Sequence, residues 1–148
     1  MYADWLANGA VIAATLATLA ACVLIHYEGL AFTSRRLAAH RGHQRIKVLY
    51  AISCVIALHV VQIWIFGLVM WLLLLWPRCG DIAGAQAPHF LDYIYLSAMT
   101  FTTVGFGDLA PRGAIRFLSG TEALTGFVLI AWSASFTYLE MERFWRGR

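Results

Sequence analysis

Residues 100–111 read Thr-Phe-Thr-Thr-Val-Gly-Phe-Gly-Asp-Leu-Ala-Pro, and this stretch decides how the rest of the chain is interpreted. Glycine alternates there with larger residues, in the order Val104, Gly105, Phe106 and Gly107. Glycine takes up left-handed backbone conformations without a steric cost, so the alternation predicts successive carbonyl groups that point to one side. Such a row of oxygens can replace the water around an ion, and the Thr103 hydroxyl can add one more. The stretch therefore predicts a backbone that coordinates ions.

The composition indicates that lipid surrounds most of the chain. Hydrophobic residues make up 61% of the 148 residues and charged residues only 13%, whereas soluble domains average about 25% charged. A helix needs about 20 apolar residues to cross a hydrocarbon core. Three segments meet that requirement, within 1–28, 48–76 and 115–138, and a shorter one at 90–101 does not. The predicted fold class is an all-α membrane protein with three transmembrane helices, a re-entrant pore helix and a filter loop.

Positive charge predicts the orientation of these segments, because cytoplasmic loops are enriched in Lys and Arg. The loop 29–47 contains five basic residues and the tail 139–148 contains three. Both are therefore expected in the cytoplasm, with the N-terminus outside the cell membrane. In this orientation the filter segment 102–108 enters the membrane from the outer side.

Several other functions are disfavoured by the same sequence. The net charge of +3 comes from basic residues that flank apolar runs, so it indicates membrane topology and not nucleic-acid binding. The apolar run of 1–28 contains no Lys or Arg, so it is not a voltage sensor. It also lacks the basic start and the cleavage site of a signal peptide, so we expect a retained helix. No hydrolytic or redox constellation predicts an enzyme or a cofactor.

The motif and its surroundings resemble the pore of potassium channels, in which Thr-Val-Gly-Tyr/Phe-Gly-Asp follows a short pore helix between an outer and an inner helix. The match covers 48–138, roughly two thirds of the chain, and implies that these residues form one pore domain. The resemblance implies a homotetramer that conducts K+ passively across a lipid bilayer. It implies K+ coordination by Thr103, Val104, Gly105 and Phe106. It also implies support for the filter from Thr102, Gly107, Asp108 and Tyr95.

Two residues depart from the family pattern. Phe106 stands where Tyr is commoner, which removes a hydroxyl group, and Met99 stands where some relatives carry an acidic partner for the Asp. Asp108 is expected to reach the Tyr95 hydroxyl instead. Because both changes affect filter rigidity, a weakly selective cation channel stays open as an alternative. A non-conducting subunit that assembles with another channel is a further alternative, which a single sequence does not exclude.

Three residues within the spans are candidates for gating. Gly126 lies midway along the third span, where glycine serves either as a bend or as a close-packing residue. Ionisable residues in a membrane span are costly and suggest function, which draws attention to His59 and Glu122. Counted at about 1.5 Å per residue, they lie at similar depths, so we expect a pair that either couples pH to gating or packs statically. Gln62 lies one turn from His59.

Two further residues carry alternatives. A haem protein that uses His26 and His59 as ligands is a rival from another class, although the two histidines are expected at different depths. Cys79 lies in a polar loop predicted on the outer side, where it is a candidate contact with the same residue of a neighbouring subunit.

Overall fold

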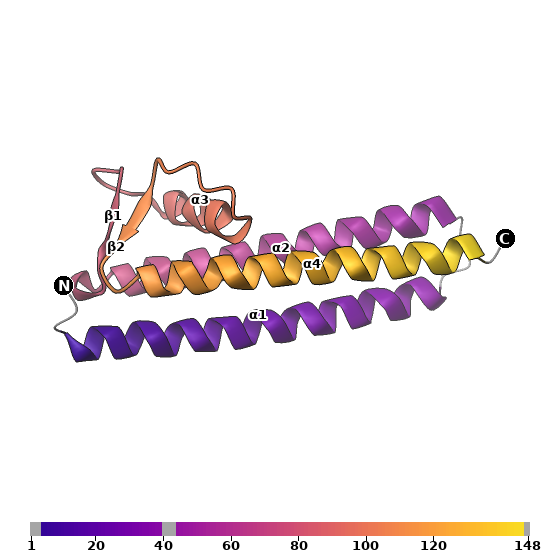
Figure 1. Ribbon diagram of the computed structural model, residues 1–148, viewed down its shortest axis with the longest axis horizontal. Coiled ribbons are helices and arrows are strands. Elements are labelled where there is room, and N and C mark those ends of the chain that lie inside the picture. Colours follow the sequence, from indigo (N-terminus) through magenta and orange to yellow (C-terminus); the bar gives the residue numbers. More distant parts are fainter. Residues whose placement is uncertain (1–3, 40–43, 147–148) are drawn as a thin grey trace.

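Three long helices lie side by side, and a short helix packs against two of them (Figure 1). This computed structural model describes residues 4–39 and 44–146. The long helices are apolar and long enough to cross a membrane. In chain order the elements are α1 (Trp5–Ala39), α2 (Gln44–Leu74), η1 (Pro77–Cys79), β1 (Asp81–Ala83), α3 (Phe90–Phe101), β2 (Ala110–Arg112) and α4 (Arg116–Arg146).

The short helix and the loop after it bring the chain back to the end of the bundle at which α2 stops. α2 ends and α4 begins at the same end of the bundle (Figure 1). α3 comes between them in the chain and lies at that end, on the side of the bundle away from α1. The predicted pore helix 90–101 has the observed bounds of α3. The arrangement is the one expected for a pore domain with a re-entrant loop.

Two of the long helices extend further than the sequence predicted. α1 continues past residue 28 to Ala39, so much of the predicted loop 29–47 is helical. α4 likewise continues through most of the predicted tail 139–148. Here Glu140 accepts a hydrogen bond from Ser34 of α1 at 3.1 Å and pairs with Arg143 at 3.1 Å. The hydrophobicity of a sequence shows where a helix leaves lipid but not where the helix ends. α1 and α4 stay helical beyond that point because they still pack on one another. Residues 1–3, 40–43 and 147–148 of the predicted segments lie outside the described residues.

α1 packs through a stripe of mostly small side chains. Its buried residues are Ala7, Val11, Thr15, Thr18, Cys22, His26, Leu30, Thr33 and Leu37. They recur at steps of three or four along the helix, which places them on one face. The three threonines donate their hydroxyl protons to carbonyl oxygens four residues earlier, at 2.7–2.8 Å. The stripe is therefore free of unsatisfied hydroxyls and lets α2 and α4 approach closely.

Glycines permit close contact at two helix interfaces. A Cβ atom added to Gly29 of α1 would lie 2.4 Å from the Leu58 side chain of α2. One added to Gly67 of α2 would lie 2.6 Å from the Ile94 side chain of α3 and 3.0 Å from its Cα. Helices in lipid associate through close packing of this kind, because lipid offers no hydrophobic drive for them to associate.

A two-stranded antiparallel sheet joins the segments on either side of the pore helix and filter. Its register pairs Asp81 with Arg112, Ile82 with Pro111 and Ala83 with Ala110. Strands of three residues carry no sequence periodicity, and the sequence predicted a plain loop in both places. The sheet fixes the distance between the chain that enters the pore helix and the chain that leaves the filter.

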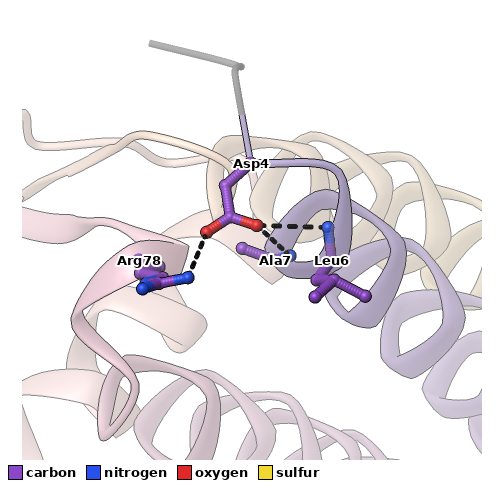
Figure 2. A network of polar contacts seen from close by, with 4 residues as sticks. All are labelled: Asp4, Leu6, Ala7 and Arg78. Carbon is purple, nitrogen blue, oxygen red and sulfur yellow. Dashed lines mark hydrogen bonds and ion pairs between the residues drawn. The ribbon is translucent and has the colours of Figure 1, made fainter.

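The start of α1 is fixed to the turn that follows α2 (Figure 2). Asp4 caps α1, because its Oδ1 accepts hydrogen bonds from the backbone N–H groups of Leu6 at 3.2 Å and Ala7 at 3.3 Å. Its Oδ2 lies 3.2 Å from Nη1 of Arg78 in η1. This ion pair is partly exposed, so it positions the helix more than it stabilises the fold.

Candidate functional site

The backbone alternates in hand along the predicted filter. Thr103, Gly105 and Gly107 have positive φ angles of 59°, 55° and 81°. Thr103 is the only non-glycine residue with a positive φ in the described part of the chain. A residue with a Cβ pays about 1–2 kcal/mol for this conformation, so the alternation must be imposed by the surroundings at Thr103. The sequence predicted the two glycines but not the threonine.

The inner end of the filter is held by carbonyl groups of α3. The backbone N–H groups of Thr102, Thr103 and Gly105 donate to the carbonyl oxygens of Ala98, Thr100 and Met99 at 3.1, 3.0 and 3.2 Å. The Thr102 hydroxyl also donates to the Ala98 carbonyl, at 2.7 Å. The filter therefore continues directly from the last turn of the pore helix.

Both faces of the filter are open in a single chain. A Cβ atom added to Gly105 or Gly107 would meet no atom within 4 Å. Val104 is 53% exposed and Phe106 is 71% exposed. A single chain thus leaves the apolar side chains of Val104 and Phe106 uncovered.

The outer end of the filter is tied back to α3. The Tyr95 hydroxyl donates a hydrogen bond to Oδ2 of Asp108 at 2.9 Å, which is the contact expected from the sequence. This bond, with burial and the negative charge of Asp108 as smaller causes, raises the pKa of Tyr95. Tyr95 therefore stays a hydrogen-bond donor to the loop that follows the filter.

Glu122 of α4 is fully buried behind the pore helix. Its Oε1 lies in hydrogen-bond contact with the Ser97 hydroxyl of α3, and that hydroxyl also lies 2.8 Å from the carbonyl oxygen of Ile63 in α2. A serine has one proton to donate, so both contacts are satisfied when the carboxyl group carries a proton of its own. Three helices thus meet at Ser97, which the sequence analysis did not single out.

Replacement of Ser97 by alanine is expected to destabilise the folded chain by about 1–3 kcal/mol, because it leaves the Glu122 carboxyl group buried without that partner. Thermal unfolding of the purified protein in detergent measures the effect. Ser135→Ala is the matched control, since Ser135 is exposed and its hydroxyl donates to the Ala131 carbonyl oxygen of its own helix, at 3.1 Å. Equal melting temperatures for the two variants would contradict this account.

The sequence predicted a pair between His59 and Glu122, and the structure shows that this prediction was wrong. In the described part of the chain neither a hydrogen bond nor an ion pair joins them; Nδ1 of His59 instead lies 3.2 Å from Oε1 of Gln62. The estimate of similar depth ignored the direction of each side chain. Glu122 contacts Ser97 within α3, whereas the ring of His59 lies beside Phe101, about one turn further along the same helix, with ring centroids 5.8 Å apart.

Gln62 joins α2 to α1 through His26. Nε2 of Gln62 lies 3.0 Å from Nδ1 of His26 and 3.3 Å from the Cys22 carbonyl oxygen. On its other side, Nε2 of His26 lies 3.2 Å from the Ser133 hydroxyl of α4. The polar contact thus spans all three long helices. Sequence spacing could not reveal it, because its members come from separate spans.

The histidine arrangement also bears on the haem alternative. His26 and His59 were expected at different depths, but their rings are stacked with centroids 5.4 Å apart. That expectation was wrong because α1 continues to Ala39, so His26 lies well inside the helix and not at its inner end. Both ring nitrogens of His26 already face Gln62 and Ser133, so this residue is not free to act as an axial haem ligand.

Gly126 of α4 packs directly against the end of the pore helix. A Cβ atom at this position would lie 2.0 Å from the carbonyl oxygen of Phe101 and 2.7 Å from its carbonyl carbon. The sequence left Gly126 as either a bend or a close-packing residue, and this contact supports close packing. α4 thereby supports the residue that immediately precedes the filter.

Cys79 is not placed to contact a neighbouring subunit. Its side chain is completely buried within the chain, and Ile115 donates its N–H to the Cys79 carbonyl oxygen at 2.9 Å. Burial, with the charge of Asp4 as a smaller cause, raises the pKa of this thiol. The polar residues around it in the sequence suggested exposure, but the side chain belongs to the hydrophobic core of the chain.

Comparison with known proteins identifies the class. The family model described as "Ion channel" matches residues 50–141, which is more than half of the chain. The chain therefore belongs to the ion channel family, and with its three long apolar helices it is a multi-pass membrane protein. It is not an enzyme. The matched region contains α3, the filter and nearly all of α2 and α4.

Individual relatives are similar over shorter regions. Protein LctB of Geobacillus stearothermophilus is 34% identical over 67 residues, which is 45% of this chain and 50% of the relative. Protein LctB of Bacillus caldotenax is 45% identical over 40 residues, 27% of this chain and 30% of the relative. The inward rectifier potassium channel Kirbac3.1 of Paramagnetospirillum magnetotacticum is 37% identical over 67 residues, 44% of this chain and 23% of the relative. The chain thus spans half or less of the length of these relatives. No solved structure matches it significantly.

Proposed function

We propose that four copies of this chain form a potassium-selective channel that conducts K+ passively. The backbone carbonyl groups of Thr103, Val104, Gly105 and Phe106, with the Thr103 hydroxyl, would coordinate the ion. The observation that carries the proposal is the alternation of backbone hand at Thr103, Gly105 and Gly107, with φ angles of 59°, 55° and 81°. An alternating backbone turns its carbonyl groups toward one side, where they can replace the water of an ion.

Assembly around a central axis explains the open faces of the filter. Irregular backbone is tolerated at membrane depth only where protein buries it or where it lines a water-filled path. A homotetramer meets both conditions, because the oxygen edges of four filters face the axis while neighbouring subunits cover Val104 and Phe106. The 53% and 71% exposure of these two side chains in one chain supports this arrangement.

The proposed orientation places the filter at the outer surface of the cell membrane. It rests on the basic residues near the opposite end of the bundle, at the end of α1, the start of α2 and the end of α4. In this orientation the N-terminus lies outside and the C-terminus in the cytoplasm. Asp108 and Tyr95 then brace the external mouth of the filter.

Ion flux from liposomes that contain the purified protein tests the function. We expect K+ flux that barium blocks and that Na+ does not replace, since barium has the charge to compete for sites built of carbonyl oxygens. Protein-free liposomes and K+ gradients with barium on each side provide the controls. Absence of flux at all pH values tested would contradict a conducting channel, and crosslinking to four copies checks the tetramer separately.

A weakly selective cation channel is the second candidate, and Phe106 is the residue that favours it. Phe106 has no hydroxyl group to bond to its surroundings, and it is 71% exposed before assembly. The same experiment separates the two functions: equal K+ and Na+ flux would establish weak selectivity. The direct hydrogen bond from Tyr95 to Asp108 favours the selective channel, because it holds the loop in the absence of that hydroxyl.

A further inference from the structure

A basic pocket lies between α1 and α2, at the end of the bundle away from the filter. It has a volume of about 350 Å³. Its lining combines Arg36 and Leu37 near the end of α1 with Ile46, Lys47 and Tyr50 near the start of α2. Figure 1 shows these two helix ends together, opposite to the end that holds α3 and the small sheet. The pocket is thus remote from the candidate pore.

The lining offers two kinds of chemistry side by side. Arg36 and Lys47 supply positive charge, and the Tyr50 hydroxyl adds a neutral donor. An arginine can hold two oxygens of one phosphate group with its planar fork, whereas a lysine acts as a point charge. Leu37 and Ile46 supply aliphatic surface next to these groups. Together they fit an anionic group that is attached to a hydrocarbon chain.

The position of Arg36 is supported from within α1. Its guanidinium carbon lies 5.0 Å from the centroid of the Phe32 ring, one helical turn earlier. A cation over an aromatic face is attracted by the ring, so this contact reduces the freedom of the side chain. Leu37 is buried between the helices, while Ile46 is exposed. The pocket is therefore lined by one buried and one exposed aliphatic side chain.

We propose that this pocket binds the headgroup of an anionic phospholipid. Lys47 and Tyr50 flank the point near residue 48 where the apolar run of α2 begins, which is where lipid phosphates lie. Basic pockets between transmembrane helices on the cytoplasmic side bind such headgroups. A soluble phosphate would use the charges but not the aliphatic lining. The phospholipid would bridge the end of α1 to the start of α2.

The inference goes beyond ion conduction and does not depend on it. α1 lies outside the matched channel region but packs against helices within it, and α2 is the outer helix of the pore domain. A lipid held by both helices would couple the composition of the membrane to the packing of α1 on the pore domain. Binding can be measured on the full chain whether or not it conducts.

Lipid binding to the full chain in detergent tests the proposal, by native mass spectrometry or by displacement of a fluorescent lipid. The probes are phosphatidylglycerol, phosphatidylcholine and inorganic phosphate. We expect phosphatidylglycerol to bind and phosphatidylcholine to bind at least about tenfold more weakly, since its headgroup has no net charge. Inorganic phosphate at the same concentration should not displace the bound lipid.

A pair of double variants separates this pocket from general surface charge. Arg36→Gln with Lys47→Gln should weaken phosphatidylglycerol binding about 20- to 30-fold, at roughly fivefold for each basic residue lost. The control, Arg35→Gln with Arg45→Gln, removes the same charge from residues next to these that do not line the pocket. It should change binding less than about threefold.

Three results would overturn the proposal: equal weakening by both double variants, equal binding of the two lipids, or displacement of the lipid by inorganic phosphate. Tyr50→Phe gives an independent check, because it removes one hydroxyl group and leaves both the charge and the ring in place. It should weaken binding by about three- to tenfold, as expected for the loss of one ordinary hydrogen bond. Unaltered binding in this variant would remove Tyr50 from the site.

Discussion

Replacement of Gly105 by alanine is expected to abolish barium-sensitive K+ flux, by at least roughly 100-fold, while the protein still assembles. The reason is conformational and not steric. Gly105 has a φ of 55°, and an added Cβ would meet no atom within 4 Å. Alanine pays about 1–2 kcal/mol in this conformation in every subunit, and the backbone can relieve the cost by turning a carbonyl group away from the ion path.

Flux from liposomes measures this effect, and size-exclusion chromatography confirms that the assembly is intact. Gly9→Ala is the matched control, because a Cβ at Gly9 also meets nothing within 4 Å but lies in regular helix in α1. It should leave flux unchanged. A Gly105→Ala protein that still conducts K+ and excludes Na+ like the parent would refute the assignment of this backbone as the filter. Conduction of both ions would instead agree with a damaged filter.

Replacement of Gly126 by alanine is expected to destabilise the chain by about 2–3 kcal/mol and to remove most of the flux. The Cβ would lie 2.0 Å from the Phe101 carbonyl oxygen, so α3 and α4 must separate. Phe101 is fully buried and is followed at once by Thr102, the first residue of the filter. Displacement of this residue therefore moves the filter as well as the pore helix.

Thermal unfolding and flux of the same preparation test both parts of this expectation. Gly120→Ala provides the control in the same helix, because nothing lies within 4 Å of its added Cβ. It should be neutral or slightly stabilising, since alanine favours helix over glycine by about 1 kcal/mol. If Gly126→Ala unfolded at the same temperature as Gly120→Ala but altered channel opening, Gly126 would act as a bend and not as a packing residue.

The features that the sequence predicted are those encoded locally. The pore helix 90–101 agrees with α3, and the two filter glycines have the positive φ angles that their alternation indicated. The Tyr95–Asp108 hydrogen bond was also expected, since its partners flank the filter at either end. Each of these follows from a short stretch of chain, where residue type and spacing are enough to define the geometry.

The features that the sequence missed depend on how the helices pack. Ser97 meets Glu122 and Ile63 because three helices converge, and no spacing along one helix reveals that contact. The stacking of His26 on His59 was missed for the same reason. A hydroxyl group in the mostly apolar pore helix was the available signal for Ser97. No comparable signal existed for the positive φ of Thr103, because threonine ordinarily avoids that conformation.

The two faces of the first helix differ in the size of their side chains. Its buried face carries Ala, Val, Thr and Cys at most positions, whereas its outer face carries larger apolar residues such as Leu16, Leu24 and Phe32. Selection on this helix would therefore act on volume. Any hydrophobic residue satisfies the lipid-facing positions, but growth by even one methylene group at Thr15 or Cys22 separates it from α2 and α4. Homologous sequences should accordingly drift freely on one side of α1 and stay small on the other, in a pattern that a hydropathy profile does not register.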